Sequence, residues 1–146
     1  MKTSELVACL SAQRDLPDAE LKTLLETDAY DALLVSAADQ KRREIYGDEV
    51  YIRGLIEFTN YCRNNCYYCG IRRDNQNTVR YRLNKEEILA CCEEGYRLGF
   101  RTYVLQGGED PYYTDERICG IVSEIRRRFP DCAITLSIGE KPRESY

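Results

Sequence analysis

Histidine is absent from the 146 residues of this chain. Without an imidazole, the chain can form neither a Cys–His zinc site nor a Ser–His–Asp triad, and it has no histidine base for catalysis. Any transition metal would have to bind mainly through cysteine thiolates. Thiolates are soft ligands that suit iron–sulfur clusters, zinc and Cu(I).

Long apolar runs are also absent. The first residues become polar again before an apolar stretch of useful length forms, so we expect neither a signal peptide nor a transmembrane span. The net charge of −4 gives no general attraction to nucleic acid or to an anionic membrane. Charged residues make up 32% and apolar residues 43%, a balance typical of a soluble globular protein. We therefore expect a cytoplasmic protein with one sizeable core.

Cysteine, in contrast, is abundant, with eight residues. Without a secretion signal, these cysteines are expected to bind metal, to act in catalysis or to be buried, rather than to form disulfides. Cys62, Cys66 and Cys69 lie within eight residues, in the spacing C-x3-C-x2-C. Three thiolates leave one coordination position of a metal centre open, as catalytic sites do. The alternative is a structural zinc site with a fourth thiolate from Cys91 or Cys92, although such sites usually show two separated ligand pairs. The cysteines outside the loop are expected to be small buried thiols: Cys9, Cys91, Cys92, Cys119 and Cys132.

The periodicity of apolar residues predicts an alternation of helices and strands. Two helices are expected within residues 16–47, followed by a strand over 50–58. A capping-box-like opening at Asn84–Glu87 predicts a helix that ends near Gly99, and Thr114 is expected to cap a further helix. Two more strands are expected over 100–106 and 132–137. The order ααβαβαβ, with helical crossovers, predicts an α/β fold with a parallel sheet.

Each expected strand is followed by a polar or cysteine-bearing segment. The three segments should meet at the carboxyl edge of the sheet, where β/α barrels and doubly wound sheets both bind ligands. A complete β/α barrel needs about 250 residues, so three strands indicate the N-terminal part of a larger protein. We assign residues 1–48 to a helical segment and residues 49–146 to the first three units of an incomplete barrel. The third strand would present an unpaired edge.

The cysteine spacing, with aromatic Tyr68 before the last cysteine, resembles the cluster loop of the radical S-adenosylmethionine (SAM) enzymes. The resemblance implies that Cys62, Cys66 and Cys69 bind three irons of a 4Fe–4S cluster. The fourth iron would bind S-adenosyl-L-methionine, which one electron cleaves to methionine and a 5′-deoxyadenosyl radical. Such an enzyme would be sensitive to oxygen.

The resemblance also implies roles for residues outside the cysteines. Gly107-Gly108-Glu109 is similar to the glycine-rich motif that meets the ammonium group of S-adenosylmethionine, although such a sequence alone is more often a turn. Tyr68 would contact the adenine through its backbone carbonyl, or would pack under the cluster. Ser137 and Glu140 would reach the same face, or would cap a following helix. A basic stretch follows the cysteines and is expected to be a solvated surface, with anion binding or electron-donor docking as the alternative: Arg72, Arg73, Arg80 and Arg82.

Four segments resemble a particular family, the FeFe-hydrogenase maturase HydE: RGLIEFTNYC (53–62), CGIRRDN (69–75), LQGGEDPYY (105–113) and TLSIGE (135–140). This resemblance implies a TIM-type barrel enzyme that helps to build the hydrogenase active-site cluster. Its partners would be the maturases HydG and HydF and a low-potential electron donor such as ferredoxin or flavodoxin. The alternatives are an enzyme of the biotin synthase or methylornithine synthase type, a simple metal-binding module, or an inactive fragment.

Overall fold

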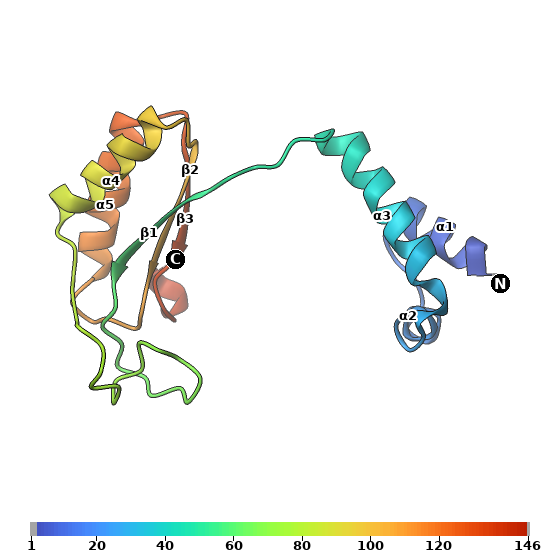
Figure 1. The fold of residues 1–146 in the computed structure, drawn as a ribbon, viewed down its shortest axis with the longest axis horizontal. Coiled ribbons are helices and arrows are strands. Elements are labelled where there is room, and N and C mark those ends of the chain that lie inside the picture. Colours follow the sequence, from blue (N-terminus) through green and yellow to red (C-terminus); the bar gives the residue numbers. More distant parts are fainter. Residues whose placement is uncertain (1–2, 146) are drawn as a thin grey trace. The chain divides into compact units, whose positions relative to one another are not determined.

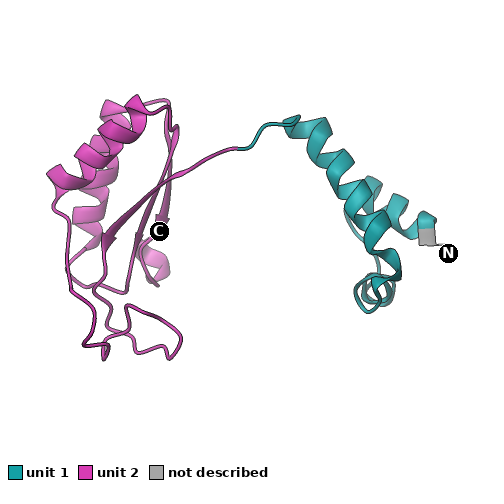
Figure 2. Cartoon of the chain, viewed as in Figure 1, with its two compact units in different colours: residues 1–50 teal, residues 51–146 magenta. Residues whose placement is uncertain are grey.

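A computed structural model describes residues 3–145 of the chain. The chain divides into two compact units, residues 1–50 and residues 51–146 (Figure 2). The first unit is entirely helical, and the second contains the whole sheet (Figure 1). No helix among the described residues is long and apolar enough to cross a membrane.

The helical unit consists of α1 (Thr3–Gln13), α2 (Asp18–Leu25), a short 3-10 helix η1 (Asp28–Tyr30) and α3 (Asp31–Tyr46). Its core is small and contains Leu6, Val7, Leu16 and Leu24. The sequence predicted only two helices here, and α1 is a third that it missed. An 11-residue helix is marginal by itself, so α1 depends on packing against α3, which no local pattern reveals.

The second unit has the order β1 (Gly54–Thr59), α4 (Lys85–Arg97), β2 (Thr102–Gly107), α5 (Asp115–Arg128), β3 (Ala133–Ser137) and the 3-10 helix η2 (Arg143–Ser145). The strands form a parallel sheet in the order β1-β2-β3, so the predicted α/β class is confirmed. The predicted helix starts are confirmed as well: Asn84 and Glu87 form a capping box on α4, and Thr114 caps α5.

Both helices of this unit cover the same face of the sheet (Figure 1). Ile56 of β1 and Leu105 of β2 are neighbours in the parallel register and contribute to the core. Ile88 of α4 and Ile125 of α5 pack into the same core and are fully buried. The alternate residue Leu55 points away from this core and is exposed. The core therefore lies between one sheet face and the two helices.

Two local predictions were wrong. The first strand was expected from Val50, but pairing starts at Gly54, opposite Tyr103. The residues before it have the β-branched and aromatic composition of a strand, yet they lack a neighbouring strand and are exposed. The second error concerns Cys91 and Cys119, which were expected to be buried and are exposed. The buried faces of their helices carry Cys92 and Ile118 instead.

Candidate functional site

The loops that leave the three strands form the candidate site. We call residues 60–83 the cysteine loop and residues 107–113 the glycine loop; a third segment, residues 138–142, follows β3. Because the strands are parallel, all three segments start at the same end of the sheet (Figure 1). This is the edge at which the sequence predicted the site.

The three cysteines of the cysteine loop are free thiols, with Cys66 exposed and Cys62 and Cys69 half-buried. The Cys69 N–H donates to the Cys66 carbonyl (3.1 Å), which closes a turn between these two cysteines. Within residues 3–145, no three Cys, His, Asp or Glu side chains converge as ligands for a single metal ion. The three thiols on one loop are soft ligands that fit an iron–sulfur cluster, and as a set of three they leave one coordination position open.

The structure also weakens the zinc alternative. Cys92 is fully buried beside Tyr103, whose hydroxyl donates to the Cys92 carbonyl (2.7 Å). Burial, together with the neighbouring Cys91 and Cys132, raises the pKa of the Cys92 thiol to about 12. Cys92 is therefore a core thiol in this structure, whereas Cys91, the other thiol named for the zinc alternative, is exposed.

Arg80 holds the cysteine loop together through hydrogen bonds to the loop's backbone carbonyls. Its guanidinium donates to the carbonyl of Asn60 and to three further backbone carbonyls, those of Ile71 (2.9 Å), Arg72 (2.6 Å) and Asn75 (3.2 Å). The expectation that the basic stretch is a solvated surface is therefore wrong for Arg80. A loop with little regular structure leaves many carbonyls without partners, and one guanidinium with five N–H donors satisfies several of them.

The glycine loop packs directly against the start of the cysteine loop. A Cβ on Gly108 would lie 2.2 Å from the Tyr61 carbonyl oxygen and 2.8 Å from Cys62 Cβ. The Arg63 N–H donates to the Glu109 carbonyl (2.9 Å), which joins the two loops by a backbone hydrogen bond. Glycine at position 108 is thus required by close approach. The predicted cysteine and glycine segments are brought together.

Glu109 connects the glycine loop to the segment after β3. Its side chain is 15% exposed, and its Oε1 accepts the Glu140 N–H (2.7 Å). Its Oε2 lies 3.4 Å from the Arg63 guanidinium. Gly139, at φ +85°, leaves room for the carboxylate, because a Cβ there would lie 2.6 Å from Glu109 Cδ. Glu140 contacts Glu109 through its backbone N–H.

A cavity of about 200 Å³ opens where these segments meet, lined by residues that include Arg63, Glu109, Glu140 and Lys141. Its lining carries charges of both signs, so it suits a zwitterionic group such as an amino acid. Ser137, the last residue of β3, is exposed and is not part of this lining.

Tyr68 and its neighbour Tyr67 are almost fully exposed, at 94% and 98%. Both roles expected for Tyr68, contact with the adenine and packing under the cluster, remain predictions. An aromatic ring that lies free on a candidate ligand loop is available to a ligand or to another part of the fold.

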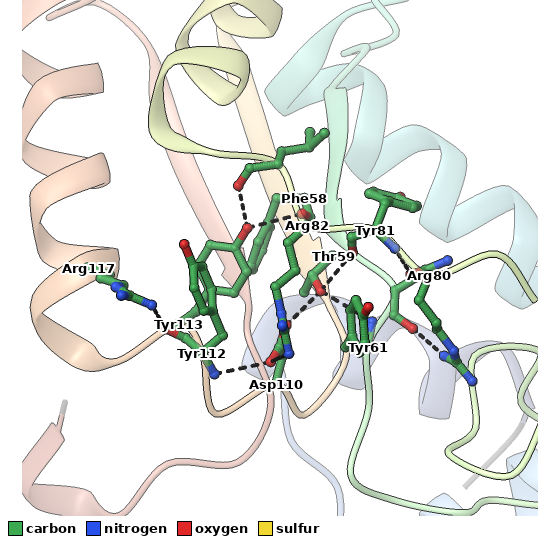
Figure 3. A network of polar contacts seen from close by, with 12 residues as sticks. Phe58, Thr59, Tyr61, Arg80, Tyr81, Arg82, Asp110, Tyr112, Tyr113 and Arg117 are labelled. Atoms are coloured by element: carbon green, nitrogen blue, oxygen red, sulfur yellow. Dashed lines mark hydrogen bonds and ion pairs between the residues drawn. The ribbon is translucent and has the colours of Figure 1, made fainter.

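Sequence reasoning missed a polar cluster at the strand ends, in which Thr59 and Asp110 are buried and the other members are more exposed. We call it the strand-end network: Thr59, Tyr61, Arg82, Asp110 and Tyr112 (Figure 3). Arg82 is exposed, as expected for a solvated surface, but it also forms an ion pair with Asp110 (2.7 Å), which the sequence did not predict. The Asp110 side chain is only 1% exposed. A signal was present in the sequence, since an acidic residue and Pro111 directly follow the glycine motif.

Burial of Asp110 would by itself raise its pKa. Hydrogen bonds from Arg82, Thr59 and the Tyr112 N–H outweigh burial and lower the pKa of this carboxyl below its ordinary value. Asp110 is therefore ionised at neutral pH. Beside it, burial and then the Asp110 charge raise the pKa of Tyr113 to about 12, which keeps that hydroxyl a donor.

A family comparison identifies the region that contains this site. The sequence model described as the Radical SAM superfamily matches residues 56–140, more than half of the chain. The match starts in β1 and ends at Glu140, so it includes the cysteine loop, the glycine loop and residues 138–140 of the third segment.

Individual relatives agree with this match. The FeFe-hydrogenase maturase subunit HydE of Thermotoga maritima is 50% identical over 117 residues, which are 80% of this chain and 33% of that protein. The 3-methylornithine synthase of Methanosarcina barkeri is 38% identical over 103 residues, 69% of this chain and 29% of that protein. The chain thus spans about a third of the length of these curated relatives.

Solved structures resemble the fold. A crystal structure of methylornithine synthase has a TM-score of 0.77 and 31% identity, covering 96% of this chain and 42% of the other. A crystal structure of HydG, a maturase of the FeFe-hydrogenase, has a TM-score of 0.82 and 25% identity, covering 99% of this chain and 34% of the other. The fold is that of the N-terminal β/α units of such barrels.

Proposed function

The chain belongs to the radical SAM superfamily, and on this premise we propose that its second unit binds a 4Fe–4S cluster and S-adenosylmethionine at the strand-end loops. The chemistry that these groups supply when bound is one-electron cleavage of S-adenosylmethionine to methionine and a 5′-deoxyadenosyl radical. The observation that supports the proposal is the packing of the glycine loop onto Tyr61 and Cys62, since it brings the two loops proposed to bind the ligands side by side.

Cys62, Cys66 and Cys69 would hold the cluster through their thiolates. They are free, and none of them is fully buried. Arg80 would keep the loop in shape through its hydrogen bonds to loop carbonyls, including that of Arg72. Backbone N–H groups and burial around the sulfurs are the means by which a protein sets the cluster potential.

Gly107, Gly108 and Glu109 would orient the methionyl end of S-adenosylmethionine. The glycines allow the backbone to approach closely, and the Glu109 carboxylate at the small cavity would attract an ammonium group. Tyr68 would offer its exposed backbone and ring to the adenosyl end. Glu140 would act through the N–H that holds Glu109 in place. We assign no contact to Ser137.

The activity of the full-length protein is proposed to be of the HydE type, supported by 50% identity to the Thermotoga protein over 117 residues. Maturation of the FeFe-hydrogenase cluster would then involve HydG and HydF as partners and ferredoxin or flavodoxin as electron donor. A methylornithine synthase activity is the second candidate, supported by the 38% identity and the TM-score of 0.77.

Anaerobic reconstitution with iron and sulfide tests the cofactor proposal. We expect the reduced protein to give a 4Fe–4S signal by electron paramagnetic resonance, and we expect this signal to change when S-adenosylmethionine is added. Protein that takes up zinc and not iron, with both metals available, would contradict the proposal. Complementation of a strain that lacks HydE, with the full-length gene, separates the HydE activity from the methylornithine synthase activity.

A further inference from the structure

Asp110 directly follows Glu109 in the sequence, but both of its carboxylate oxygens already accept hydrogen bonds from the protein. Its Oδ2 accepts from Arg82 Nε (2.7 Å) and from Thr59 Oγ1 (2.8 Å). Its Oδ1 accepts from Arg82 Nη2 (2.9 Å) and from the Tyr112 N–H (3.1 Å). Two bonds from one guanidinium to one carboxylate fix the relative orientation of both groups. The carboxylate is thus fully used by the protein itself.

The partners of Asp110 come from segments far apart in the sequence (Figure 3). Thr59 ends β1 just before the cysteine loop, and Arg82 stands near the end of that loop. Asp110 itself belongs to the glycine loop after β2. One buried carboxylate therefore connects the entry and the exit of the cysteine loop to the glycine loop.

Tyr61, the residue before Cys62, is held from two sides by the same network. Its N–H donates to Thr59 Oγ1 (3.2 Å), and its ring lies 3.9 Å from the Arg82 guanidinium carbon. A cation over an aromatic face is attracted to it. The Tyr61 carbonyl in turn is the atom that a Cβ on Gly108 would meet. The position of Cys62 relative to the glycine loop therefore depends on Arg82 and Asp110.

Stability alone is a weak explanation for this pair. The Asp110 side chain is 1% exposed, so removing its charge from water costs much of what the attraction returns, while the Arg82 side chain stays 35% exposed, where an ion pair contributes little. A fixed geometry, in contrast, is what a bidentate pair provides. Small displacements of reacting groups reduce rates strongly, so loops without regular structure need such fixation.

We propose that the Arg82–Asp110 pair is a positioning device that sets the distance and orientation between the cysteine loop and the glycine loop, and so between the cluster and S-adenosylmethionine. The inference rests on the proposed function of these loops. Asp110 also lines the small cavity, but its carboxylate oxygens are taken up by Arg82, Thr59 and the Tyr112 N–H, so the pair is proposed to act through Tyr61, Cys62 and Glu109. The proposed iron ligands are the three cysteine thiolates, which stay in place when the pair is lost, so this loss should affect the response to S-adenosylmethionine more than the binding of iron.

The test uses the full-length protein with Asp110→Asn, which keeps the shape of the side chain and removes its charge. We expect iron content within about twofold of the wild type, and at least about a tenfold loss in apparent affinity for S-adenosylmethionine or in its cleavage rate per cluster. Arg82→Lys keeps the positive charge but cannot form the bidentate pair. Its affinity for S-adenosylmethionine and its cleavage rate should lie between those of the wild type and Asp110→Asn. The matched control is Asp131→Asn. Asp131 lies just before β3, and its exposed carboxylate pairs with Arg101, so this variant should behave as wild type.

If Asp110→Asn does not fold, Thr59→Val removes one donor to the carboxylate without leaving a charge unpaired, and a weaker loss of the same kind is expected. An unchanged response per cluster in the folded variant would overturn the inference. So would a loss of cleavage that merely follows a loss of iron, because it would indicate a structural role. A wild-type protein without any response to S-adenosylmethionine would instead contradict the proposed function.

Discussion

The two units of the chain differ in how they use charged side chains. In the described part of the helical unit, the ion pairs join near neighbours on exposed surfaces, as Lys22–Glu26 and Arg43–Asp39 do at i,i+4 spacing. In the α/β unit, Arg82 and Asp110 are 28 positions apart, and Thr59 and Asp110 are 51 apart. This second set is concentrated at the carboxyl end of the sheet (Figure 3).

These two kinds of charged contact have different effects on the structure. An exposed pair within one helix adds little to stability and fixes nothing beyond that helix. A buried carboxylate with donors from separate loops requires those loops to meet in one arrangement. The α/β unit therefore carries the geometry that a ligand site needs, and the same substitution should have different consequences in the two units.

The largest contrast is expected between Cys62→Ala and Cys9→Ala. Loss of Cys62 removes one of three thiolates proposed to bind the cluster, so reconstituted iron and the 4Fe–4S signal should fall to near the background level. Cys9 lies on α1 in the helical unit and is half-buried. Its replacement should leave iron content and signal unchanged. Iron and sulfide analysis with electron paramagnetic resonance measures both; equal iron content in the two variants would contradict the assignment.

A smaller effect is expected for Gly108→Ala. The new Cβ would lie 2.2 Å from the Tyr61 carbonyl oxygen, so the two loops must separate. Forcing extra volume into a packed position costs about 1–3 kcal/mol, and the free energy of unfolding from urea titration should fall by this amount. The response to S-adenosylmethionine should weaken as well, because the loops no longer meet.

Gly120→Ala is the matched control for this substitution. Gly120 lies within α5, and a Cβ there would meet nothing within 4 Å. Alanine favours a helix over glycine by roughly 0.5–1 kcal/mol, so this variant should be slightly more stable than the wild type. If both variants changed stability in the same direction, the close approach of the two loops would not be the reason for glycine at position 108.

Patterns that depend on neighbouring residues predicted much of the fold. Asn84 and Glu87 lie three positions apart, and their capping box needs nothing from the rest of the chain. The strand after α4 and the apolar stripe of α5 were likewise predicted from the pattern of neighbouring residues. Helix α1 escaped prediction because it depends on packing against α3, and Val50 was placed in a strand because composition does not show where a neighbouring strand ends.

For the candidate site too, short motifs could be predicted from the sequence, whereas contacts between distant residues could not. Cys62, Cys66, Cys69 and Gly107–Glu109 stand in short motifs, and the strand order alone placed them at one edge. The roles of Arg80 and Arg82 were not predictable, because the acceptors of Arg80 are backbone carbonyls and Asp110 lies 28 positions from Arg82. A run of arginines looks the same in sequence whether its charges meet water or a buried acceptor.

The smallest effect is expected for Asp39→Asn in the helical unit. Hydrogen bonds from Arg43 and then Arg42 lower the pKa of Asp39 below its ordinary value of 3.8. A carboxyl whose pKa is lower in the folded state contributes stability above its unfolded pKa, and this contribution is lost as the pH falls through the folded pKa. Because Asp39 is exposed, about 1 M salt should also remove the contribution, since charges are then screened beyond roughly 3 Å.

Amide hydrogen exchange along α3 measures this local contribution. The protection of α3 in the wild type and in Asp39→Asn should differ slightly at neutral pH and low salt, and should coincide at high salt or once the pH falls below the lowered pKa of Asp39. The pKa of Asp110 is lowered too, so its contribution is likewise lost on acidification, but burial shields the pair from salt. At neutral pH, the difference between wild type and Asp110→Asn in the exchange of β1 and β2 should therefore persist in 1 M salt. If both differences disappeared with salt, Asp110 would behave as a surface charge, and the contrast between the two units would fail.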